Sequence, residues 1–117
     1  MKRLIFLKDK RGDFEKKIND LIQDQQYMVL DVTMMAWDRM QKLYYLGLLV
    51  EEQERFFRQN CLVLENRDPE NITRDLDDFS EVMSKAKNVP YEITMVRTFK
   101  ISTPRGERYF AYVFYRD

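Results

Sequence analysis

The sequence predicts an α+β domain, a small mixed and partly closed β-sheet or barrel flanked by about four helices and ending in a β-hairpin. Stretches rich in β-branched and aromatic residues stand at both ends of the chain, and amphipathic helical patterns fill the middle. The chain has 117 residues, which is the length of one domain, so we expect a single domain over residues 1–117. With 44% hydrophobic and 14% aromatic residues, that domain can bury a sizeable core.

The first quarter of the chain predicts a strand, a helix and a second strand. Residues 2–7 contain the apolar run of the first strand, and a polar stretch ending in glycine follows it. Asp13 is placed to cap a helix that continues to about residue 24, because apolar residues recur there at helical spacing. Residues 27–32 then form the second strand.

The middle of the chain predicts three more helices and a short strand. Apolar residues at helical spacing indicate a helix over about 34–46, with Gly47 in the left-handed position just past its end. Acidic residues open a third helix over about 51–59, and an apolar run predicts a strand over 61–65. A last helix is expected over about 73–87, before a break at Pro90.

The C-terminal stretch, residues 91–116, predicts a β-hairpin. Thr103-Pro104-Arg105-Gly106 fits a type I turn, with proline second and glycine fourth. A loop with an even number of residues sets the facing pairs as Phe99 with Phe110, Met95 with Phe114, Arg97 with Tyr112, Val96 with Val113, Thr98 with Ala111 and Lys100 with Tyr109. Both faces carry apolar groups, so we expect the hairpin to lie inside a larger sheet or to curl into a barrel.

Composition excludes several classes of protein. The chain has no histidine, which rules out Ser-His and Cys-His catalysis and His-ligated metal sites. Its single cysteine, Cys61, cannot form an internal disulfide and indicates a reducing compartment. No apolar run has membrane-spanning length. We therefore expect a cytoplasmic protein that is not an enzyme, with no cofactor, no metal and no membrane contact.

Charge is unevenly distributed along a chain whose net charge is zero. Residues 1–17 and residues 85–117 each hold seven basic and three acidic groups, whereas the middle is acidic. If the first strand lies beside the C-terminal hairpin, these charges can pool into one basic patch. The alternative is that opposite charges intermix over the whole surface.

The hairpin supplies the candidate binding residues. Cations alternate there with tyrosines, a pattern typical of strands that bind single-stranded RNA, because rings stack on bases and cations contact phosphates. The candidate nucleic-acid-binding residues are Arg97, Lys100, Arg105, Arg108, Tyr109 and Tyr112. The alternative is an edge hairpin whose charges only prevent aggregation. Strand alternation puts Arg97 and Arg108 on one side of the sheet and Lys100 on the other.

The chain resembles the PrgU-type family of small regulators encoded on enterococcal conjugative plasmids. The likeness lies in its size, in the order of elements after MKRLIFLKD, and in the terminal segment FKISTPRGERYFAYVFYRD. This resemblance implies a PUA-like fold, which is common among RNA-binding proteins. It also implies control of conjugation and surface-adhesin gene expression, at the level of the transcript.

The expected function is therefore a non-enzymatic, RNA-binding regulator of gene expression, with single-stranded RNA as its partner. The alternative is an inhibitor or adaptor, encoded by a phage or plasmid, that binds a protein partner through an apolar or acidic surface. A continuous basic groove favours RNA, and a flat apolar or acidic patch favours a protein. The sequence predicts no oligomeric state.

Overall fold

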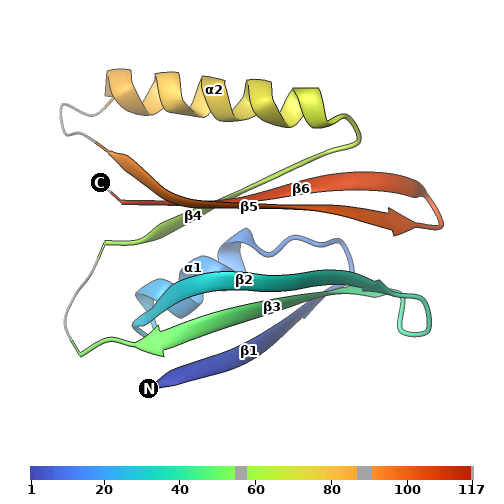
Figure 1. Ribbon diagram of the computed structural model, residues 1–117, viewed down its shortest axis with the longest axis horizontal. Helices are drawn as coiled ribbons and strands as arrows, with labels where there is room; N and C mark the ends of the chain where they lie inside the picture. Colours follow the sequence, from blue (N-terminus) through green and yellow to red (C-terminus); the bar gives the residue numbers. More distant parts are fainter. Residues whose placement is uncertain (55–57, 87–90, 117) are drawn as a thin grey trace.

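The computed structural model describes residues 1–54, 58–86 and 91–116 (Figure 1). Six strands and two helices make up this part of the chain: β1 (Lys2–Asp9), α1 (Glu15–Gln23), β2 (Tyr27–Asp38), β3 (Leu43–Glu52), β4 (Asn60–Asn66), α2 (Pro69–Ala86), β5 (Glu92–Thr103) and β6 (Gly106–Arg116). The strands form two antiparallel sheets that pack face to face. We call β1-β3-β2 sheet A and β4-β6-β5 sheet B.

The two halves of the chain repeat one topology. Each half runs strand, helix, strand, strand, and in each the third strand lies between the other two. Both hairpins, β2–β3 and β5–β6, therefore turn at the same end of the molecule (Figure 1). The sequence shows no internal repeat, so the likeness lies in topology alone.

The core lies between the inner faces of the two sheets, with α1 packed into it (Figure 1). Alternate residues of β3 and β6 point inward and are fully buried, as the period of a strand requires. Helix α1 buries Ile18 in the same cluster, together with Phe14, which directly precedes the helix. Its Asn19 side chain also covers the edge of β4, because the amide donates to the Cys61 carbonyl oxygen (2.9 Å) and accepts from the Cys61 N–H (2.9 Å).

The outer faces of the sheets differ. Helix α2 covers the outer face of sheet B, where the Phe79 ring lies 5.2 Å from the Tyr115 ring. On the outer face of sheet A, Leu4 and Phe6 are 54% and 52% exposed. No helix in the part of the chain that the structure describes is long and apolar enough to cross a membrane.

The C-terminal hairpin confirms the predicted register. Phe99 faces Phe110 and Met95 faces Phe114, and the pairing continues to Thr103 and Gly106 around a two-residue loop. Gly106 has a φ of 113°, a conformation that side chains other than glycine rarely adopt. The expected strands at 2–7, 27–32 and 61–65 and the helices at 13–24 and 73–87 are also present, with shifted ends. Residues 55–57, in the middle of the helix expected over 51–59, lie outside the described residues. So do residues 87–90, which hold the end of the helix expected over 73–87 and the break expected at Pro90.

The expected fold class is nevertheless wrong. The described chain is mostly β-structure with two helices, not about four, and its two sheets stay separate and open instead of forming one partly closed barrel. The helix expected over 34–46 is in fact the end of β2, a turn and the start of β3. The helix expected from residue 51 is wrong at its start, because β3 continues to Glu52.

The turn between β2 and β3 explains the error. It contains neither glycine nor proline, so it lacks the usual sequence signal. Asp38 provides the turn instead, because its Oδ1 accepts from the N–H groups of Met40 (2.8 Å) and Gln41 (3.1 Å). Lys42 adopts a φ of 55°. Gly47 lies within β3, where an added Cβ would be 2.6 Å from Thr33 Oγ1.

Candidate nucleic-acid interface

A pocket with a volume of about 1000 Å³ lies at the end of the molecule where both hairpins turn. The repeated topology brings together there the loop after β1, the β2–β3 turn, the β5–β6 turn and the end of β4. The pocket, which we call the basic pocket, is lined by Lys10, Arg11, Asp13, Trp37, Arg39, Lys42, Tyr44, Glu65, Thr103, Pro104, Arg105 and Arg108.

The loop after β1 is held in place by Asp9. Its Oδ1 accepts from the N–H groups of Arg11 (2.8 Å) and Asp13 (3.1 Å), and its Oδ2 lies 3.3 Å from Lys17 Nζ. Burial opposes ionisation of this carboxyl, but the two backbone donors and Lys17 together hold its pKa below the ordinary value. The loop passes close to the core at Gly12, where an added Cβ would lie 3.2 Å from the Tyr44 ring. Asp9 therefore fixes where the cations of this loop stand.

Positive charge dominates the basic pocket. Six of its lining residues are cations and two are carboxylates. Arg108 forms an ion pair with Glu65, and both side chains are partly buried. Among the described residues, no carboxylate lies within ion-pair distance of the other five cations. These five charges come from three separate loops, and they converge on a space that is large enough for a nucleotide.

Two aromatic rings form the wall of the basic pocket next to the core. Trp37 and Tyr44 are in edge-to-face contact, with ring centroids 4.8 Å apart. Tyr44 is only 5% exposed, and burial raises the pKa of its hydroxyl. Trp37 is partly exposed, and its buried Nε1 donor has no hydrogen-bond partner among the described residues. The two rings therefore form an apolar wall of a pocket whose other lining is mostly charged.

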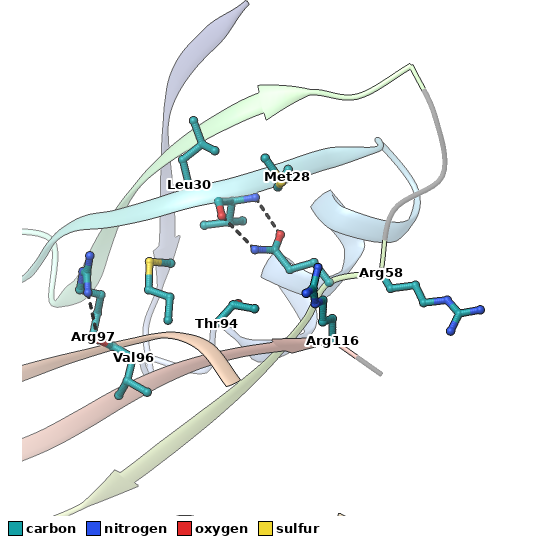
Figure 2. A pocket seen from close by; sticks show the side chains of 10 residues that line it. Met28, Leu30, Arg58, Thr94, Val96, Arg97 and Arg116 are labelled. Atoms are coloured by element: carbon teal, nitrogen blue, oxygen red, sulfur yellow. Dashed lines mark hydrogen bonds between the residues drawn. The ribbon is translucent and has the colours of Figure 1, made fainter. Parts of the chain in front are cut away.

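The structure brings only two of the six predicted site residues, Arg105 and Arg108, into the basic pocket. Arg97 lies elsewhere, on β5, where its Nε donates to Asp31 Oδ1 of β2 at 2.7 Å. Figure 2 shows it at a second cleft, between β2 and β5. Lys100 lies on the opposite face of sheet B, with its Nζ 3.3 Å from Glu107 and 5.9 Å from the Tyr109 ring centroid.

The two predicted tyrosines are not available for stacking in one site. Tyr112 is fully buried, its hydroxyl donates to the sulfur of Met35 (3.3 Å), and burial raises its pKa. It is a core residue and cannot contact a base. Tyr109 is partly buried on the face of sheet B that Lys100 shares. The six hairpin residues therefore do not form one surface, and Lys100 lies on the opposite side of the sheet from Arg97, as strand alternation predicted.

Sequence reasoning missed most of the basic pocket, including the cations Lys10, Arg11, Arg39 and Lys42. These cations could have been identified from the basic residues in the β2–β3 and β5–β6 turns. That step requires recognising the segment after Asp38 as a turn. Charge from the two ends of the chain does pool, but only through the loop after β1. The strand β1 itself pairs with β3 and not with the C-terminal hairpin.

The described residues contain no group of three or more His, Cys, Asp or Glu side chains that could hold a metal. Cys61 is 3% exposed, and burial raises the pKa of its thiol, so little nucleophilic thiolate forms at neutral pH. What the basic pocket offers is binding of anions. Comparisons of the chain with models of known protein families, with curated proteins and with solved structures found no match.

Proposed function

We propose that this protein is a non-enzymatic regulator of gene expression that binds single-stranded RNA in the basic pocket. The observation that supports this is the excess of cations over carboxylates there, with five cations that lack an acidic partner among the described residues. Cations in such an arrangement bind phosphates and release counterions, which makes binding favourable and dependent on salt.

The shape of the site favours a single strand over a duplex. The cations surround a pocket instead of lining a flat or convex strip, so a flexible backbone can enter where a rigid helix cannot. The Asp13 carboxylate in the lining is an acceptor, and the RNA 2′-hydroxyl is a donor that DNA lacks. RNA is therefore the preferred partner in this proposal, and the cytoplasm is the expected place of action.

The proposal rests on the basic pocket and not on a family. The resemblance to the PrgU-type regulators implied a PUA-like barrel, and the two open sheets contradict that fold. The resemblance also implied control of conjugation or adhesin transcripts. A binding assay with candidate transcripts can test that implication.

The test replaces one cation from each loop of the pocket with alanine: Lys10, Arg39 and Arg105. Each phosphate contact on a single strand contributes about 0.7 to the slope of log affinity against log salt, so the slope should fall by about 2. Fluorescence anisotropy with a labelled single-stranded RNA over a salt series measures it. The same sequence as DNA should bind more weakly.

The matched control replaces Lys2, Arg74 and Lys85, which removes the same charge from exposed positions outside the pocket. This variant should keep most of the wild-type slope. If both triple variants lose affinity equally, binding follows net charge and the basic pocket is not the site. If neither loses affinity, the RNA-binding proposal is wrong for this pocket.

A further inference from the structure

A second cleft, which we call the seam cleft, lies on one side of the molecule where an edge strand of sheet A faces an edge strand of sheet B. Its volume is about 980 Å³. Figure 2 shows Met28 and Leu30 of β2 on one wall and Thr94 and Val96 of β5 on the other. The lining residues are Met28, Val29, Leu30, Arg58, Gln59, Thr94, Met95, Val96, Arg97 and Arg116.

The wall formed by β2 presents backbone groups that need partners. β2 is the edge strand of sheet A, and successive residues of a strand point their N–H and C=O groups to opposite sides. Val29 points both groups away from β3, because they bond to the Gln59 side chain instead. Gln59 Oε1 accepts from the Val29 N–H (2.8 Å), and Gln59 Nε2 donates to the Val29 carbonyl (2.9 Å).

These two bonds are the pair that a neighbouring strand makes with one residue of an antiparallel ladder. The amide of Gln59 therefore takes the place of a peptide group at the free edge of β2. A comparable substitution occurs on β5, the edge strand of sheet B, where Arg97 Nη1 donates to the carbonyl oxygen of Val96 at 3.1 Å. At these positions, the partners of the edge backbone groups are side chains and not a neighbouring strand.

The two edges are kept from pairing with each other. Both strands carry an irregularity at the cleft, between Val29 and Asp31 on β2 and between Ile93 and Met95 on β5. Such bulges bend a strand and disrupt its ladder. The ion pair of Arg97 with Asp31 then joins the strands at one end of the cleft. The cleft therefore lies between two edge strands that do not form hydrogen-bonded pairs with each other.

We propose that the seam cleft binds an extended segment of a partner protein, which adds to the edge of β2 and displaces the Gln59 side chain. Strand addition of this kind obtains affinity from main-chain hydrogen bonds and specificity from alternate side chains. A nucleic acid cannot supply the ladder that Val29 requires, which favours a protein here. This site is separate from the basic pocket and does not depend on it.

The lining indicates the chemistry of the segment. Five lining residues are apolar, three are arginines and none is a carboxylate. Arg97 and Arg116 form ion pairs with Asp31 and Glu92, which lie beside the lining and are not part of it. A strand in which apolar residues alternate with acidic ones matches both features.

The probe is a fluorescein-labelled peptide of about seven residues, a usual strand length, in which valine alternates with glutamate. Its matched control is the same peptide with N-methyl groups on the backbone amides of one edge, which removes donors and leaves the side chains unchanged. A second control replaces glutamate with lysine. The proposal predicts binding of the first peptide and at least about tenfold weaker binding of both controls, since ladder bonds and charge complementarity are lost.

On the protein, Gln59→Ala frees the edge and should tighten peptide binding about fivefold or more, because the competing amide is gone. In the wild type, the amide signal of Val29, whose N–H faces the free edge, should shift on titration by NMR and exchange more slowly with solvent. This readout does not require the variant to fold. The triple variant of Lys10, Arg39 and Arg105 should bind the peptide as the wild type does.

Equal binding of the N-methylated peptide would overturn the proposal, because side chains alone would explain the affinity. Weaker binding to a folded Gln59→Ala variant would also overturn it, since Gln59 would then be part of the binding surface and not a competitor. If single-stranded RNA shifts the Val29 amide and displaces the peptide, the seam cleft belongs to the nucleic-acid surface instead.

Discussion

Replacing Phe110 with alanine should destabilise the fold by about 3–5 kcal/mol, the usual cost of removing a fully buried ring. Phe110 is 0% exposed, and its ring lies 5.6 Å from that of Tyr44 in edge-to-face contact. Losing that pair accounts for about 0.5–1.5 kcal/mol of the total, and lost burial and a residual cavity account for the rest. The ring also packs against Gly12, 3.3 Å from where a Cβ would stand, so the cavity opens beneath the basic pocket.

Urea unfolding followed by far-UV circular dichroism measures the loss. A domain of this size has a stability of about 5–15 kcal/mol, so the variant should retain a folded baseline. Its midpoint should fall with little change in slope, as expected for a two-state loss of stability. Phe6→Ala is the control, because Phe6 is 52% exposed on the outer face of sheet A and should cost less than about 1 kcal/mol. Equal losses for the two variants would refute the assignment of Phe110 to the core.

Two further changes test local features. Asp9 has a lowered pKa in the folded state, so its contribution to stability is complete above its ordinary pKa of 3.8 and is lost as the pH falls through the lower folded value. Asp9→Asn should therefore be less stable than the wild type at pH 7, with the difference shrinking below about pH 4, whereas Lys17→Ala should show a smaller effect at pH 7. Gly47→Ala should cost about 1–3 kcal/mol in urea unfolding, because its Cβ would lie 2.6 Å from Thr33 Oγ1 and 2.9 Å from Met34 Cγ. An unchanged midpoint for that variant would mean that the strands adjust without strain.

The C-terminal hairpin could be predicted from the sequence because its signals are local and agree with one another. Pro104 and Gly106 define a short turn, and β-branched and aromatic residues fill both arms. Once the loop length is fixed, every facing pair from Met95 to Thr103 follows. The helices α1 and α2 were predicted for the same reason, since long amphipathic patterns are decisive.

The β2–β3 hairpin could not be predicted because its local signals conflict. Trp37 and Tyr44 lie seven positions apart, a spacing that suits one face of a helix as well as two strands joined by a turn. The structure shows them in contact as facing residues of neighbouring strands. Two features favour the hairpin over the helix: the Asp38 side chain forms the turn, and alternate β3 residues are buried against sheet B. The second feature is a tertiary contact, so the local sequence does not reveal it.

Only part of the basic pocket was predicted, because local sequence patterns reveal one hairpin and not the packing of the two sheets. Arg105 and Arg108 lie on the one hairpin that sequence reasoning identified, so they were named. Lys10 and Arg39 join them only through the stacking of two sheets, which no local pattern encodes. Tyr112 has the residue type of a stacking platform, but in the folded chain it fills the core.

The repeated topology also bears on how the chain is synthesised. Every strand pair of sheet A lies within the first 52 residues, and every pair of sheet B lies after them. Sheet A can therefore form on the ribosome while the second half is still being translated. Helix α1 belongs to the same half, but the part of the inner face of sheet A that packs against sheet B then stays open to water until sheet B forms. The nascent N-terminal half is for that interval the species that is most exposed to aggregation and to chaperones.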